Sequence, residues 1–218
     1  SGAESSSTSI INTHSGKNIN VDDRYIPTGV IYYTKLYESL KLRDLSMGAL
    51  DSITHCIEST LSINKNSYLD FLSIQTINYV FKVDLLDKLI SNDKLLNIDF
   101  KNLSILSFNG GIAQNNAGSG ICHALAHAAE AMTGLHHTKC ITYFFSPIMN
   151  YYNLTNLDFK NLFDSKIIEL TCKISQKMKS IEDLKLLDDI INDNDSFIRL
   201  INLAKEDLCW RLYKKKID

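Results

Sequence analysis

Residues 118–138 read GSGICHALAHAAEAMTGLHHT, and the interpretation of the whole chain depends on this stretch. Four histidines occur here within fifteen residues, at positions 123, 127, 136 and 137. His123 and His127 are four apart among small and apolar residues, so they share one face of a predicted helix. Gly134 is expected to end this helix, which leaves His137 free to fold back from a loop or from the start of the next helix.

A second pair with the same spacing lies upstream, in residues 45–62, LSMGALDSITHCIESTLS. Apolar residues three and four apart predict a helix that begins near Ser46, its expected N-cap. Asp51 and His55 therefore lie on one helix face, with their Cβ atoms about 6 Å apart. Two such pairs on separate helices, together with a trailing histidine, can hold a single ion.

Each of these residues also has a simpler interpretation when it is taken alone. A single histidine on an apolar helix is more often a hydrogen-bonded core residue than a metal ligand. Asp51 can be an acid in the first turn that faces the helix dipole, and His136 can be a solvated residue at a helix end. The joint pattern of two pairs and a fifth residue favours a metal site.

The types of the predicted ligands indicate which ion they hold and in which role. Imidazole nitrogens with one carboxylate suit Fe²⁺ or Zn²⁺, whereas Ca²⁺ or Mg²⁺ takes mostly oxygen ligands. Three histidines and one aspartate leave a divalent ion with one net positive charge and at least one open coordination position. A structural zinc site is more often closed by four ligands that include cysteine, so the open position indicates catalysis.

Composition limits the classes of protein to be considered. The chain has 218 residues, of which 44% are apolar, enough for one substantial core or two small ones. Its net charge of −2 gives no electrostatic reason to expect nucleic acid or an anionic membrane as a partner, and no apolar run is long enough to span a bilayer. The five cysteines are widely spaced with no CxxC pair, which predicts reduced thiols and a cytoplasmic location. Three of these cysteines, Cys56, Cys122 and Cys140, are expected to be buried.

The predicted fold is mostly α, with a short β segment at its start. β-branched runs in residues 7–17 (STSIINTHSGK) and 26–36 (IPTGVIYYTKL) predict two strands. A lone hairpin is marginal in water, so these strands are expected to belong to a sheet whose other strands lie elsewhere. From about Ser46 the apolar spacing is helical, and all nine glycines lie at or before Gly134, which predicts a helical bundle toward the C-terminus.

Four segments resemble the iron-containing (group III) alcohol dehydrogenases. GALDSITHCIES (residues 48–59) resembles their GxDALTHAIE segment, and GICHALAHAAEAMTGLHH (residues 120–137) resembles GxxHALAHPLGAxxxxPH with the same internal spacing. SGAESSST (residues 1–8) resembles the family's TGSEVT. GKNINVDDRYIP (residues 16–27) keeps the family's lysine, arginine and proline in register. The resemblance covers nearly the whole chain, although Ala128 and Thr138 stand where the family has proline and glycine.

The resemblance implies a role for each matching residue. It makes Asp51, His55, His123 and His137 the ligands of a divalent metal, either Fe²⁺ or Zn²⁺. His127 would lie near the nicotinamide and take part in proton relay. NAD or NADP would be approached by the positions of Lys17, Ser6 and Ser1.

The resemblance also implies the domain organisation. Residues 1–44 correspond to the terminal strands of a dinucleotide-binding domain, and residues 45–218 to an all-helical metal-binding domain. The glycine-rich loop that holds the pyrophosphate in the family has no counterpart in this sequence. The chain is therefore expected to be incomplete, and these residues alone are expected to bind NAD(P) weakly.

The expected function is hydride transfer between a primary alcohol or aldehyde and NAD(P). The doublet His136–His137, together with HCIES, is similar to the branch that oxidises the terminal hydroxyl of eight-carbon sugar acids. We also expect a homo-oligomer. Two alternatives remain, a non-catalytic metal-binding or assembly fragment and a helical metal-dependent phosphohydrolase, although the latter favours a consecutive His-Asp pair and none occurs in this sequence.

Overall fold

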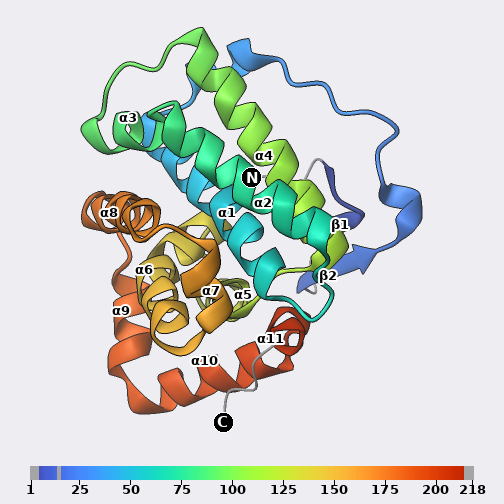
Figure 1. The fold of residues 1–218 in the computed structure, drawn as a ribbon. Coiled ribbons are helices and arrows are strands. Elements are labelled where there is room, and N and C mark those ends of the chain that lie inside the picture. The colour runs from blue at the N-terminus through green and yellow to red at the C-terminus, as the bar shows by residue number, and fades with distance from the viewer. Residues whose placement is uncertain (1–4, 14–15, 214–218) are drawn as a thin grey trace.

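The computed structural model describes residues 5–13 and 16–213. These residues form a helical body with a small β hairpin beside it (Figure 1). In chain order the elements are β1 (Thr8–Thr13), β2 (Gly16–Val21), the short 3₁₀ helices η2 (Asp23–Tyr25) and η3 (Thr34–Ser39), α1 (Leu42–Leu61), α2 (Ser67–Lys82), α3 (Leu85–Ser91), α4 (Asn97–Ala117), α5 (Ile121–Thr133), α6 (His137–Thr155), α7 (Leu157–Leu162), α8 (Ser165–Ile181), α9 (Lys185–Asn192), α10 (Asn194–Glu206) and α11 (Leu208–Leu212). The prediction of a mostly helical fold is confirmed.

Helix α1 lies at the centre of the body and packs against α2, α4, α6 and α8. From Ser46 to Leu61 all but one of its residues are buried, including the predicted apolar positions Leu50, Ile53 and Ile57. Polar residues can be buried here because hydroxyl groups bond back to helix carbonyls, as Thr54 Oγ1 does to the carbonyl of Leu50 at 2.7 Å. The residues of α1 are therefore held rigidly on several sides.

The start of α1 differs from the sequence prediction. The helix begins at Leu42 rather than near Ser46, and its N-cap is Lys41. Ser46 is fully buried one turn inside the helix, where its hydroxyl donates to the carbonyl of Leu42 at 2.9 Å. A serine signals an N-cap only when its hydroxyl accepts from the first turn, and Ser46 instead donates backwards.

Helix α4 approaches α1 closely at Gly110. A Cβ atom at this position would lie 2.8 Å from the carbonyl oxygen of Ser52, so only glycine lets the two backbones come this close. Helix α5 then starts at Ile121 and ends at Gly134, whose φ of 71° is left-handed. The predicted break at Gly134 is confirmed, and His137 is the first residue of α6.

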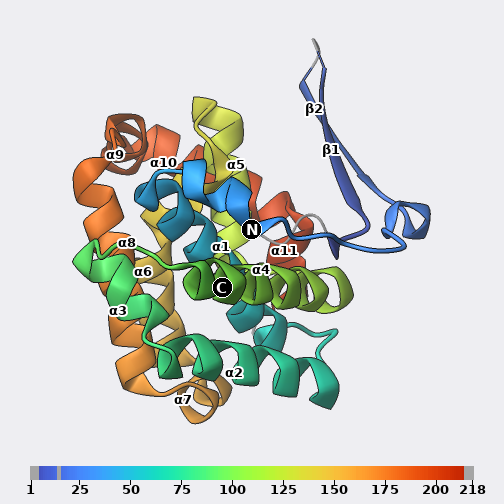
Figure 2. The same cartoon turned by 90° about the horizontal axis from the view of Figure 1, so that it is seen from above.

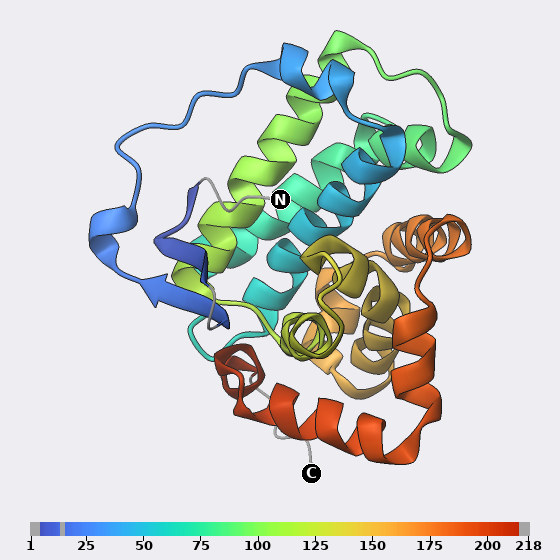
Figure 3. The ribbon, with the colours of Figure 1, turned by 180° about the vertical axis from the view of Figure 1, so that it is seen from behind.

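The C-terminal helices cover α5. Both α10 and α11 contact α5, and the red ribbon of these helices runs along one side of the body when it is seen from behind (Figure 3). A backbone bridge between Ser62 and Tyr213 also ties the end of α11 to the end of α1. The last helical segment therefore contacts the same helices that carry the predicted ligands.

The β segment is an antiparallel hairpin in which Thr8 pairs with Val21 and Thr13 with Gly16 (Figure 2). The prediction of a strand in residues 26–36 is wrong, because the second strand is β2 and the later run is irregular before η3. Ile31 in that run is 95% exposed, so its apolar residues have no sheet to pack against. That the hairpin belongs to a nucleotide-binding domain, with a boundary at residue 44, stays a prediction.

Two further predictions, of buried cysteines and of no membrane-spanning segment, can be compared with the described residues. Cys56, Cys122 and Cys140 are fully buried, as expected. Within residues 5–13 and 16–213, no helix combines the length and the apolar character that a membrane span requires.

Candidate metal centre

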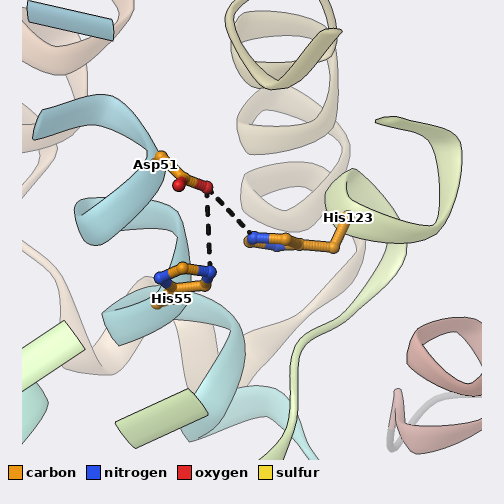
Figure 4. Close-up of side chains that lie close together, drawn as sticks. All are labelled: Asp51, His55 and His123. Carbon is orange, nitrogen blue, oxygen red and sulfur yellow. Dashed lines mark ion pairs between the residues drawn. The ribbon is translucent and has the colours of Figure 1, made fainter. Parts of the chain in front are cut away.

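Three imidazoles from three helices converge on one carboxylate oxygen. His55 Nε2, His123 Nε2 and His137 Nε2 lie 3.7, 3.3 and 3.6 Å from Asp51 Oδ1. Asp51 and His55 come from adjacent turns of α1, and His123 points at them from α5 (Figure 4). His137 reaches the same oxygen from the first residue of α6, so the structure brings together all four residues that the sequence singled out as ligands.

The side chains fit a divalent ion. Asp51 Oδ1 and His123 Nε2 are buried and have no hydrogen-bond partner, although they are only 3.3 Å apart. Buried polar atoms are rarely left without a partner, and a shared ion would satisfy both of these. Asp51, His55 and His123 offer one ligand atom each within 4.8 Å of one another. One oxygen and imidazole nitrogens are a donor set for iron or zinc rather than for calcium.

Glu58 fixes the orientation of His123. Its buried carboxylate accepts a hydrogen bond of 2.7 Å from His123 Nδ1, so in the neutral ring the lone pair is on Nε2, which faces Asp51. The same carboxylate accepts from the backbone N–H groups of Gly120 and Cys122, each at 2.7 Å, and thereby caps the first turn of α5. A fourth bond, also of 2.7 Å, comes from the hydroxyl of Tyr152.

The sequence analysis missed Glu58, although the sequence contains a signal for it. Asp51, His55 and Glu58 are spaced four and three apart, so they lie along one face of α1. A carboxylate on the face that carries two candidate ligands is the group that commonly supports a metal-binding histidine.

The charges of the centre are strongly coupled. Burial would raise the pKa of Asp51, but the three imidazoles around it hold that pKa well below its usual value. Burial also opposes protonation of His137, yet the carboxylates of Asp51 and Glu130 raise its pKa to about 9. Burial lowers the pKa of His55 to about 3. Without an ion, the anionic Asp51 therefore favours protons on His123 and His137, though not on His55, and a divalent cation would replace those protons.

His127 lies beside the centre and not among its four converging atoms. Its ring stacks on that of His137 at 5.1 Å between centroids, with an interplanar angle of 29°. Its Nδ1 lies 3.0 Å from Asp207 Oδ2, at the N-cap of α11. With Cys209, these two residues form another group whose ligand atoms lie within 4.8 Å of one another. The sequence analysis did not consider Asp207, because no spacing rule connects residues this far apart.

The remaining predicted residues have separate positions. His136 is the N-cap of α6 and its ring accepts from the backbone N–H of Thr138, which gives it a structural role. Ser6 is buried, in a segment that α4 holds through a bond of 2.6 Å from the Ser7 N–H to Asn115 Oδ1. Lys17 lies in β2, and Ser1 lies outside the described residues.

Solved structures identify the class of fold. The chain matches 1,3-propanediol oxidoreductase with a TM-score of 0.81 and 17% identity, covering 100% of this chain and 60% of that chain. It matches sulfoacetaldehyde reductase from Bifidobacterium kashiwanohense, solved in complex with NAD+, with a TM-score of 0.79 and 15% identity, covering 100% and 59%. The architecture is therefore that of the helical part of alcohol dehydrogenases and related reductases.

The chain belongs to the Fe-containing alcohol dehydrogenase family, because its residues 45–201 match the model of the family's C-terminal part. Among curated relatives, 4-hydroxybutyrate dehydrogenase of Clostridium kluyveri is 26% identical over 82% of this chain and 48% of its own length. Alcohol dehydrogenase 4 of Schizosaccharomyces pombe is 32% identical over 42% of this chain and 21% of its own length. The chain thus spans about half or less of these relatives. The family is one of oxidoreductases, as the resemblance implied.

Proposed function

We propose that the chain is the metal-binding part of an alcohol dehydrogenase that interconverts a primary alcohol and an aldehyde with NAD or NADP. The observation that carries this proposal is the convergence of three imidazole nitrogens on the unpartnered Oδ1 of Asp51. This donor set leaves open positions on an ion, which a substrate hydroxyl can use. Family membership supplies the type of reaction, and the terminal hydroxyl of a sugar acid is one candidate substrate.

Each residue of the centre has a proposed task. Asp51, His55, His123 and His137 hold the ion, and Glu58 keeps His123 in the tautomer that binds metal. When bound, Fe²⁺ or Zn²⁺ would supply Lewis acidity that lowers the pKa of the substrate hydroxyl, and NAD or NADP would supply the hydride acceptor. His127, whose ring stacks on that of His137, carries the hydroxyl proton away from the centre.

The nucleotide would approach from the N-terminal side of the chain. We propose that Lys17, Ser6 and Ser1 line its nicotinamide end, and that residues 1–44 complete a dinucleotide-binding domain. The bond from the Ser7 N–H to Asn115 anchors this segment to α4, which supports a fixed position for Ser6. We further propose that the active enzyme is a homo-oligomer.

Metal analysis tests the centre. The chain purified without chelators should contain close to one equivalent of iron plus zinc, and the Asp51→Asn/His123→Ala variant should contain almost none. His136→Asn is the matched control, because asparagine also caps helices and His136 is not among the converging residues. A wild-type chain that lacks both metals, even after incubation with either ion, would refute the centre.

Hydride transfer tests the reaction. We expect NADH- or NADPH-dependent reduction of aldehydes when a dinucleotide-binding domain precedes residue 1, and little turnover by the 218 residues alone. The Asp51→Asn/His123→Ala variant of the same longer chain should be inactive. Equal turnover by that variant would show that the centre takes no part in the reaction.

A further inference from the structure

His127 is held by a residue near the other end of the described chain. Its Nδ1 lies 3.0 Å from Asp207 Oδ2, and the two residues are 80 positions apart. Their side chains are 28% and 21% exposed, so the pair lies at the edge of the helical body rather than in free solvent. The contacts of α10 and α11 with α5 bring the two residues together.

The carboxylate of Asp207 is itself fixed in orientation. Its Oδ1 accepts from the backbone N–H of Cys209 at 2.7 Å, as the N-cap of α11, and only Oδ2 is directed at His127. Burial would raise the pKa of Asp207, but the bond with His127 holds it below the usual value. An ionised carboxylate can only accept, so Nδ1 of His127 must be the atom that carries the proton.

The position of the His127 ring beside the metal centre makes its tautomer important for proton transfer. His127 stacks on His137 at 5.1 Å and meets His123 edge-on at 6.1 Å between centroids. With the proton on Nδ1, the lone pair is on Nε2, on the other side of the ring from Asp207. A relay that takes up a proton needs its lone pair on a nitrogen that Asp207 does not occupy, and the opposite tautomer would present an N–H there instead.

We propose that Asp207 is a positioning residue that fixes His127 as the Nδ1–H tautomer, with Nε2 free to accept a proton. The catalytic consequence rests on the proposed function, but the tautomer itself does not. Burial and the charge of Asp207 raise the pKa of the neighbouring Cys209 thiol, which disfavours the thiolate that a metal ligand requires. The His127–Asp207 pair is therefore a hydrogen-bonded dyad.

Substitution by asparagine discriminates this role from helix capping. Asparagine caps helices about as well as aspartate, so Asp207→Asn keeps α11 capped. Because the Cys209 N–H occupies one side of the group, the amide oxygen will turn toward it and the NH₂ will face His127. Nδ1 must then accept, and the ring is forced into the Nε2–H tautomer.

The test is ¹⁵N NMR of the zinc-loaded, ¹⁵N-histidine-labelled chain of 218 residues, at a pH where the imidazole is neutral. The spectrum of His127→Gln identifies the signals of His127. We expect a protonated Nδ1 in the wild type, reversal of the two nitrogen shifts in Asp207→Asn, and loss of the single-tautomer signature in Asp207→Ser, which retains a capping hydroxyl. Asp193→Asn is the matched control, because Asp193 caps α10 through Ser196 and touches no histidine that the structure describes.

Three results would overturn the proposal. Two are a wild-type His127 with its proton on Nε2, or an unchanged tautomer in both Asp207 variants. The third is a second bound zinc that is lost in Cys209→Ser, because Asp207 would then be a ligand. None of these results depends on turnover, so they are separate from a failure of the hydride-transfer test. If both the proposed role of Asp207 and the proposed function hold, Asp207→Asn in the active enzyme should lower kcat about 10²-fold with little change in KM.

Discussion

The Glu58 carboxylate accepts four hydrogen bonds of 2.7 Å, from two backbone N–H groups, one imidazole and one phenol. These bonds serve at least two purposes, because the first two cap α5 and the third orients His123. A single residue thus connects the position of a helix to the tautomer of a predicted ligand. At the residue scale, the groups that support the ligands shape the centre as much as the ligands do.

Replacing Glu58 with glutamine should weaken both functions. The amide has only one acceptor atom, so at least one of the four donors faces an NH₂ group and loses its bond. We expect zinc affinity to fall about 10- to 100-fold and the free energy of unfolding to fall by about 1–3 kcal/mol. Zinc competition titration and urea unfolding measure the two effects. Glu169→Gln, on the exposed side of α8, should change neither quantity.

Zinc affinity should rise with pH below about 9. In the metal-free chain the pKa of His137 is raised to about 9, so at neutral pH the ion must displace a proton. One displaced proton corresponds to a tenfold stronger affinity for each unit of pH, and His123, whose pKa is also raised, adds to the slope. Competition with a chelator between about pH 6.5 and pH 8 tests this, and a flat profile would contradict it.

At the scale of the elements, the centre depends on how the helices that carry it pack against their neighbours. Gly110 allows the backbone of α4 to approach that of α1 closely, and the residues of α1 from Ser46 to Leu61 are packed on several sides. The positions of Asp51 and His55 therefore depend on packing partners outside the centre. A disturbance of that packing should reach the ligands even though α4 itself contributes none of them.

Gly48 of α1 and Gly110 of α4 should respond in opposite ways to alanine. A Cβ at Gly110 meets the Ser52 carbonyl at 2.8 Å, whereas one at Gly48 has nothing within 4 Å. Gly110→Ala should therefore destabilise the chain by about 1–3 kcal/mol, and Gly48→Ala should stabilise it by about 0.4–1 kcal/mol. Thermal or urea unfolding of the two variants measures the difference. A neutral Gly110→Ala would mean that α1 and α4 can separate without cost.

A feature could be predicted from the sequence when the residues that determine it are close together along the chain. The helices, the break at Gly134 and the pairing of Asp51 with His55 depend on neighbours within four residues, and sequence spacing reports these directly. The spacing cannot show that Asp207 meets His127, or that the run around Ile31 is left without a sheet, because both depend on packing between distant segments. Glu58 lies between these cases, since its helix face is predictable and its four donors are not.

At the scale of the whole molecule, an ion at the centre would link α1, α5 and α6. Ligand binding to the folded state alone stabilises it by about 2.7 kcal/mol when the free ligand is at a hundred times its Kd. For a chain of this size that corresponds to a rise in Tm of about 5–10 °C. Differential scanning calorimetry with and without zinc measures the shift. The Asp51→Asn/His123→Ala variant should show none, and an equal shift there would place the stabilising ion elsewhere.

The distribution of the ligands along the chain also has a kinetic consequence. Asp51 and His55 share α1, but α2, α3 and α4 lie between them and His123 and His137 in the sequence. We therefore expect a partly folded chain to offer an ion only two ligands, with the complete set forming late. We expect zinc to slow unfolding in denaturant while leaving the refolding rate nearly unchanged, because the complete set of ligands that zinc binds is not yet assembled in the transition state. The ion would then stabilise the folded state against unfolding without helping the chain to fold.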